Sequence, residues 1–351
     1  MKADSSDKIQ APILSHLPQA SDFTARALPT NPFITPDLHA AFNLCLDLES
    51  RAVPLPDPRH PPAVLCARVL GYTLIEAPSR DHLAGSINKR SSDDDLLALG
   101  RYYICRLFKA VKGPTSVPSD SPSPPSIEYE QSSLTIKEVV LLRDGHHCML
   151  RTDLYDISYV EQNPSILEAQ SLNWAFSSLY CTYIFPESNL GDGAEHPSDK
   201  LEWAASVWAA MHMFGMEELN GAGNHRLENV LTLCDVLHEY FGKLDDGQPN
   251  TYVAVSTMFG LIGRLPSRVV TFTTPDPKAL PLPNPAYLAL HAACRRVAHM
   301  SGAADYVKNA LQEEEEVRNR IETMGVLAED GSSMDLFERY IATRLIEITT
   351  T

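Results

Sequence analysis

The sequence predicts a mainly helical protein with one small module that combines strands and helices. Two observations lead to this fold class. Apolar residues recur at helical spacing towards both ends of the chain, whereas short segments rich in aromatic and β-branched residues gather in its middle. With 351 residues, 44% of them hydrophobic, the chain is long enough to form two domains with sizeable cores.

The N-terminal third is expected to contain a disordered segment followed by helices. Residues 1–31 are polar, with scattered prolines and no sustained period, so we expect them to be disordered. They contain no apolar segment with a small-residue cleavage site, so no secretory signal is expected. Residues 32–112 form the predicted helical N-terminal unit. Its helices are expected to begin near Pro36, with Asp37 as the cap, and to span residues 62–77 and 93–112.

A run of prolines and serines, GPTSVPSDSPSPPSIEYEQSS, occupies residues 113–133 and predicts a linker. Residues 134–245 are expected to form the module with both strands and helices. Its predicted elements, in order, are a helix over 134–142, a turn at Asp144-Gly145 into a strand, a strand over 179–186, a buried helix over 199–214, a strand over 229–233 and a helix over 234–241.

Residues 246–351 are expected to form a helical C-terminal extension. A short strand is predicted over 267–272, followed by a proline-rich loop. Asn284 and Pro285 are placed to start a helix over 286–300, in which Tyr287, His291 and Cys294 have the spacing of packing residues. The remaining helices carry Glu313–Glu316 and residues 334–348.

Charge and composition limit the classes of partner. The formal net charge is −16, and residues 134–245 contain 17 acidic against 6 basic residues, which disfavours a nucleic-acid partner unless a local groove is positive. The composition does not argue against a protein partner. The sequence contains no run of 18 or more apolar residues, so no membrane-spanning segment is predicted. The seven cysteines, an odd number without a CxxC pair, predict reduced, mostly buried thiols in an intracellular protein of the cytoplasm or nucleus.

One pair of residues has a spacing that suggests chemistry. Asn229 and His238 lie nine residues apart, across a predicted strand that leads into a helix. This is the spacing of the second half of a metal-dependent nuclease site. In such a site a base at the end of a first strand activates water, the asparagine fixes the loop that follows the base, and the histidine holds a divalent metal.

The chain resembles a fungal family of proteins that carry an HNH, or ββα-metal, nuclease domain. The resemblance rests on the order of several segments: LGYTLIEA, LALGRYYICRLFK, VVLLRDGHHCML, YCTYIFPESN, LNGAGNHRLENVLTLCDVLHEYF and PLPNPAYLALHAACRRVAHMSGAADYV. It implies an HNH-like ββα-metal module between helical N- and C-terminal regions, and a metal-dependent phosphodiester hydrolase. By this resemblance Asn229 takes the place of the central asparagine, and His238 that of the helix-borne metal ligand.

Two positions depart from the family pattern. Tyr183 stands where the family has its histidine base, and Gly242 stands where it usually has an aspartate. An unperturbed phenol is ionised in only about one molecule in a thousand at neutral pH, and a histidine-like value would need a shift of roughly 3 pKa units, near 4 kcal/mol. The resemblance therefore predicts a degenerate site with weak or no activity.

The metal and the function keep alternatives open. If the site is active, a divalent metal (Mg, Mn, Ni or Zn) is expected on His238, with His225 as the histidine near enough to serve as a second ligand. Otherwise Asn229 and His238 are structural remnants. The two hypotheses are a weak HNH-type endonuclease that uses Tyr183, Asn229 and His238, and a pseudoenzyme that keeps the fold to bind a protein partner.

Overall fold

The computed structural model describes residues 24–52, 61–77, 80–104, 136–164, 175–185, 227–234, 250–253 and 269–309. These belong to two compact units. One comprises residues 1–24, 114–190 and 222–292, and the other residues 25–113, 191–221 and 293–351. The linker and four predicted helices, over 199–214, over 234–241, at Glu313–Glu316 and over 334–348, lie outside the described residues, except for Cys234, which ends a strand.

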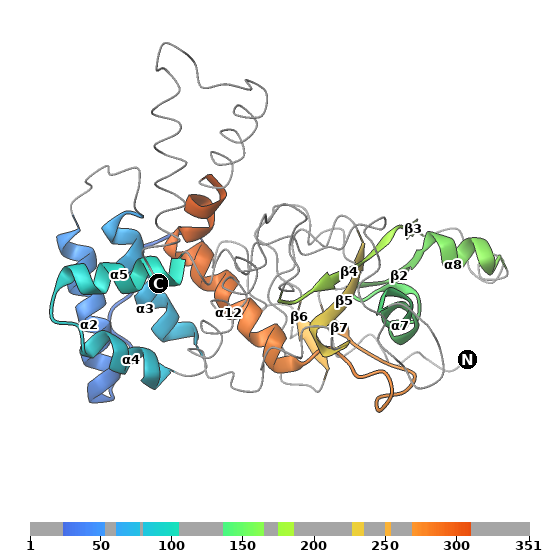
Figure 1. Cartoon of the computed structure of the whole chain (residues 1–351), viewed down its shortest axis with the longest axis horizontal. Helices are drawn as coiled ribbons and strands as arrows, with labels where there is room; N and C mark the ends of the chain where they lie inside the picture. The colour runs from blue at the N-terminus through green and yellow to red at the C-terminus, as the bar shows by residue number, and fades with distance from the viewer. Residues whose placement is uncertain are drawn as a thin grey trace, which may run out of the picture. The chain divides into compact units, whose positions relative to one another are not determined.

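Four helices of the second unit follow one another closely in the sequence and pack together in space (Figure 1). They are α2 (Pro36–Arg51), α3 (Ala63–Glu76), α4 (Arg80–Asn88) and α5 (Asp93–Tyr103). The sequence predicted α2, α3 and α5. It missed α4, because nine residues with only three buried side chains give a weak periodic signal.

The starts of these helices differ in how they are capped. Ser92 caps α5: its hydroxyl accepts a hydrogen bond from the amide of Asp95 at 3.2 Å and donates one to the Asp95 carboxylate at 2.8 Å. At α2 the expected cap was wrong. Thr35 occupies the cap position and makes no side-chain cap bond, and Asp37 lies inside the first turn. Pro36 at the first helical position supplies the preset backbone angle instead.

A close approach of α3 and α5 depends on a glycine. A Cβ placed on Gly100 would lie 2.5 Å from the Cβ of Cys66 and 2.9 Å from its Cα. No side chain larger than hydrogen fits between the two helices there. The core around this contact is apolar and fully enclosed, with Phe42, Cys45, Val69, Leu70 and Leu74 all buried.

Residues 24–31 are mostly exposed but are held in place at several points, although the sequence predicted disorder for the whole of residues 1–31. The Arg26 amide donates to the Met300 carbonyl at 3.0 Å, and the Leu28 amide donates to the Glu49 carboxylate at 3.1 Å. The Leu28 side chain is buried. An extended segment without a period of its own is therefore held by partners distant in the sequence, which composition does not reveal.

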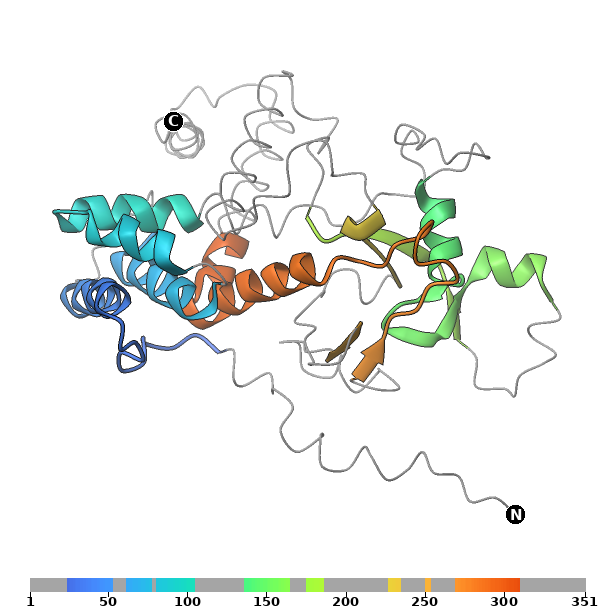
Figure 2. The same ribbon diagram turned by 90° about the horizontal axis from the view of Figure 1, so that it is seen from below.

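The other unit contains the strands (Figures 1 and 2). A three-stranded sheet has the order β1-β2-β3, with β1–β2 antiparallel and β2–β3 parallel, and β4–β5 and β6–β7 are antiparallel pairs. The bounds are β1 His147–Cys148, β2 Arg151–Asp156, β3 Ala175–Ser177, β4 Leu179–Tyr183, β5 Val230–Cys234, β6 Thr251–Val253 and β7 Val269–Thr271.

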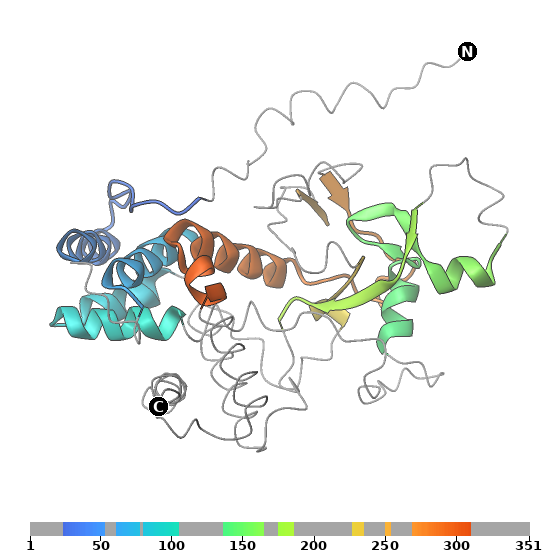
Figure 3. The ribbon, with the colours of Figure 1, turned by 90° about the horizontal axis from the view of Figure 1, so that it is seen from above.

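Two short helices accompany these strands, and α7 (Ile136–Arg143) packs on β4 and β5 (Figure 3). The second is α8 (Ile157–Gln162). The sequence predicted α7, the turn after it, β4, β5 and β7. At that turn both Gly145 (φ 64°) and His146 (φ 57°) have a left-handed backbone. Helix α8 and strands β3 and β6 are too short to show a period and were missed.

The helix α12 (Pro285–Ser301) follows the prediction for residues 286–300 closely. The Asn284 side chain accepts a hydrogen bond from the Ala286 amide at 2.9 Å, as expected of its cap. Residues 222–292 belong to the same unit as residues 114–190, so this unit continues past the expected module boundary at residue 245. Among the described helices, none is long and apolar enough to cross a membrane.

Candidate functional site

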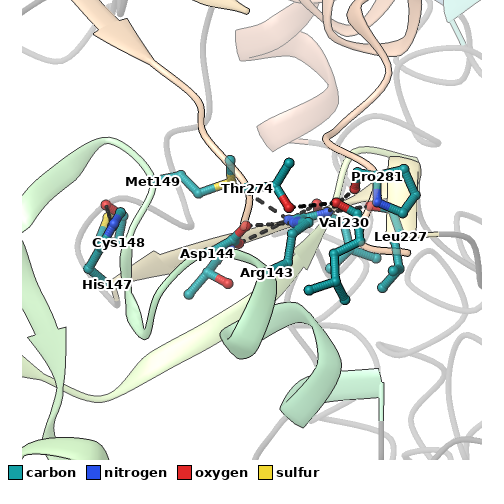
Figure 4. A network of polar contacts seen from close by, with 11 residues as sticks. Arg143, Asp144, His147, Cys148, Met149, Leu227, Val230, Thr274 and Pro281 are labelled. Atoms are coloured by element: carbon teal, nitrogen blue, oxygen red, sulfur yellow. Dashed lines mark hydrogen bonds and ion pairs between the residues drawn. The ribbon is translucent and has the colours of Figure 1, made fainter. Parts of the chain in front are cut away.

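A fully buried ion pair holds the centre of the strand-containing unit together (Figure 4). Arg143, the last residue of α7, donates to both carboxylate oxygens of Asp144, at 2.6 and 2.9 Å. Both side chains have 0% exposure. Two adjacent residues of opposite charge thus neutralise each other out of contact with water.

The remaining hydrogen-bonding capacity of this pair connects segments far apart in the sequence. Arg143 donates to the carbonyls of Leu227 at 2.6 Å, Val230 at 2.8 Å and Pro281 at 3.4 Å. The Asp144 carboxylate accepts from the Thr232 amide at 3.2 Å. Buried charges are tolerated when they are paired and saturated with hydrogen bonds, which is the case here. The pair therefore fixes β5 and the loop before α12 against the end of α7.

Strands β4 and β5 place the two sequence-predicted site residues, Tyr183 and Asn229, one register position apart. Their register pairs Tyr183 with Val230, so Asn229 comes directly before the end of the ladder. Side chains alternate across a strand, so Tyr183 and Cys181 share one face with Val230. That face packs on α7 through Ile136 and Val140. Tyr183 is 4% exposed, within this apolar cluster.

Asn229 braces the backbone just beyond Tyr183. Its side-chain oxygen accepts from the Phe185 amide at 3.0 Å, and its side-chain nitrogen donates to the Phe185 carbonyl at 2.9 Å. Its own carbonyl accepts from the Ile184 amide at 2.8 Å. The asparagine side chain thus continues the strand pairing by one more residue, in a place where it is 3% exposed.

The ring of Phe185 extends this arrangement to α12. It contacts Tyr287 edge-on at 6.1 Å and His291 at 6.2 Å between ring centroids. The Asn284 amide also donates to the Glu228 carbonyl at 2.9 Å, next to Asn229. Tyr287 and His291 are buried, which confirms the prediction that they are packing residues. The first half of α12 therefore supports the segment that follows β4.

The other expected site residues are not placed. His238 and His225 lie outside the described residues, and so does Gly242. Within the described part of the chain, no group of three or more His, Cys, Asp or Glu side chains is arranged to hold a metal ion. Of the predicted constellation, the described residues therefore include Tyr183 and Asn229, which lie at the paired ends of β4 and β5.

The two histidines after the α7 turn take part in ring packing. The ring of His146 stacks on Tyr159 at 3.9 Å and 2°, and His147 contacts Tyr155 edge-on at 5.8 Å. Burial lowers the pKa of His146 below its usual value, partly opposed by the nearby negative charge of Asp156. A neutral imidazole on an aromatic ring fits a structural role at the start of α8.

Sequence inspection missed the residues that hold this site in shape. The Asp144-Gly145 turn was found, but the arginine before it was not singled out, although a buried partner for the aspartate is what fixes β5. The ring of Phe185 was also missed. A charged dipeptide at the end of an apolar helix is only a weak signal for the buried Arg143–Asp144 pair. Nothing in the local sequence pattern indicates the role of Phe185.

No family model, curated protein or solved structure matches the chain. What the chain does is therefore inferred from the geometry around Tyr183 and Asn229 and from its charge.

Proposed function

We propose that residues around the β4–β5 pair form an HNH-like nuclease module whose hydrolytic activity is weak or absent. The observation that carries the proposal is the double hydrogen bond between the Asn229 side chain and the Phe185 backbone. An asparagine that fixes the loop after the base position is one of the three parts expected of a ββα-metal site. The bonds of Asn229, which lies directly before β5, support such a brace, and Tyr183 stands where the resemblance leads us to expect a histidine base.

The environment of Tyr183 supports weak or absent activity. A general base needs a path to the attacking water and a pKa near the working pH. Tyr183 is packed against Ile136 and Val140 in an apolar cluster, where burial disfavours a charged phenolate. The surplus of acidic residues over 134–245 further weakens the attraction for a phosphate backbone.

A nuclease assay with base-restoring variants tests the proposal. The full-length protein is incubated with plasmid DNA and with single-stranded RNA, adding Mg²⁺, Mn²⁺, Ni²⁺ or Zn²⁺ in turn. We expect little or no cutting by the wild type. If the site lacks only its base, Tyr183→His produces cutting that a second substitution, His238→Ala, abolishes.

The control for introducing a histidine into a buried strand position is Tyr252→His, on β6, whose side chain is also buried and does not belong to the cluster around Tyr183. Cutting that appears in both variants would point to a contaminating nuclease or to nonspecific exposure of the chain. Rapid cutting by the wild type that survives His238→Ala and Asn229→Ala would refute the proposal.

A protein-binding pseudoenzyme is the second candidate. The burial of Tyr183 and the acidic module both favour it, because neither serves catalysis on a polyanion. If neither the wild type nor Tyr183→His cuts any substrate, we propose that the module acts through a protein partner of net positive charge. Loss of that binding with added salt would support an electrostatic association.

A further inference from the structure

Two cysteines from distant parts of the chain meet beside the β1–β2 hairpin. Cys148 ends β1 and Cys234 ends β5, and 86 residues separate them in the sequence. The Met149 amide donates to the Thr232 carbonyl at 2.9 Å, which brings the two strand ends together. The Cys234 side chain helps to raise the pKa of Cys148, which indicates that the two thiols lie close together, and both side chains are buried. Close approach of two thiols is the first requirement for a disulfide.

A positive charge lies near both thiols. Arg151 is the direct cross-strand neighbour of Cys148 in the β1–β2 pair, and its guanidinium interacts with Cys148 and with Cys234. A nearby arginine favours the thiolate, which is the reactive form of cysteine. Asp153 binds the same guanidinium at 2.7 and 3.1 Å, so part of this charge is compensated.

We propose that Cys148 and Cys234 form a reversible disulfide in the presence of a hydroperoxide, linking β1 covalently to the end of β5. One thiolate attacks a peroxide oxygen and becomes a sulfenic acid as the O–O bond breaks and hydroxide leaves. The second thiol then attacks the sulfenic sulfur and releases water. Overall two thiols and one H₂O₂ give one disulfide and two water molecules, so the thiols are oxidised and the peroxide is reduced.

Burial sets the rate of this reaction. It raises the pKa of Cys148 well above the usual value. At pH values below that pKa, the fraction of thiolate grows about tenfold for each unit by which the pH rises. Oxidation is therefore expected to be slow at neutral pH and to become faster as the pH rises, in proportion to the thiolate fraction. Cys181 is an internal reference: burial raises its pKa to about 12, and the groups that shift it are charged side chains and not a second thiol.

The test uses the full-length wild-type protein. It is treated with hydrogen peroxide at about pH 7 and about pH 8.5, then unfolded, alkylated, digested without reductant and mapped by mass spectrometry. We expect one linked peptide pair containing Cys148 and Cys234, formed faster at the higher pH and lost on treatment with dithiothreitol. Free or irreversibly oxidised Cys148 and Cys234 without that linked pair would overturn the proposal.

Matched variants assign the pair. Cys234→Ala is expected to remove every disulfide that contains Cys148, whereas Cys181→Ala, at an equally buried position on the neighbouring strand, leaves the Cys148–Cys234 pair unchanged. A disulfide between Cys148 and Cys181 in the wild type would contradict the pairing. Because the wild-type map decides the outcome, the proposal stays testable even if a variant folds poorly.

Discussion

Replacing Asn229 with alanine is expected to lower the free energy of unfolding of the strand-containing unit by roughly 2–6 kcal/mol. The alanine leaves the Phe185 amide and carbonyl unpaired in a place that water does not reach, since Phe185 is itself buried. Each buried group without a partner costs roughly 1–3 kcal/mol. The strand bond between the Ile184 amide and the residue 229 carbonyl is retained, so the effect isolates the side-chain brace.

Hydrogen exchange measured by NMR or mass spectrometry reads this effect locally, alongside urea unfolding followed by circular dichroism. A loss of 2 kcal/mol corresponds to roughly 30-fold faster exchange of the Phe185 amide if that amide opens with the unit. Asn163→Ala is the matched control, because its side chain donates one hydrogen bond to the Tyr159 carbonyl at the end of α8. It is expected to cost about 1 kcal/mol.

The variant Asn229→Asp tests the direction in which stability changes with pH. In Asn229→Asp the carboxylate can accept from the Phe185 amide but cannot donate to the Phe185 carbonyl, so its pKa in the folded state is expected to rise above the unfolded value near 3.9. The stability of this variant is then highest below the unfolded value and is lost as the pH rises through the folded value. Equal stability of wild type and Asn229→Ala, or an aspartate variant that gains stability between about pH 4 and pH 7, would refute the brace.

Three further outcomes follow from contacts elsewhere. Arg143→Met leaves the buried carboxylate of its partner uncompensated and is expected to cost roughly 3–5 kcal/mol by urea unfolding, against less than about 1 kcal/mol for Arg151→Met, whose ion pair is partly exposed. Gly100→Ala forces the α3–α5 contact apart and is expected to lower the free energy of unfolding by about 1–3 kcal/mol. Gly85→Ala, with open space around the added Cβ, is expected to stabilise α4 by roughly 0.5–1 kcal/mol. Thermal unfolding of the two variants measures both effects. Because burial lowers the pKa of His146, the free energy of unfolding is expected to fall as the pH drops below about 6.5 and to level off below the folded pKa. The variant His146→Asn, whose asparagine tolerates the left-handed backbone at this position, is expected to remove this pH dependence when unfolding by urea is followed by NMR at several pH values. An unchanged pH dependence would refute the assignment to His146.

Much of the fold could be predicted because the relevant signals are local. Helices α2, α3, α5 and α12 carry apolar side chains at helical spacing, and Asn284 caps α12 as expected. Propensity and capping act within a few residues, so one sequence is enough to read them.

The candidate site could be predicted only in part from such local signals. A spacing motif indicated Asn229, and a family resemblance indicated Tyr183; the β4–β5 register pairs Tyr183 with Val230, the residue after Asn229. The sequence did not indicate that Tyr183 faces Ile136 and Val140, because which face of a short strand is covered depends on a helix more than 40 residues upstream.

The sequence by itself determined where the main helices and paired strands run and that the chain is strongly acidic. Only the tertiary structure decided that Asn229 clamps the Phe185 backbone, that Arg143 and Asp144 neutralise each other in the core, and that Cys148 meets Cys234. Each of these contacts pairs groups whose energy depends on the exclusion of water by residues distant in the chain. That exclusion is a property of the packed structure and leaves no local pattern in the sequence.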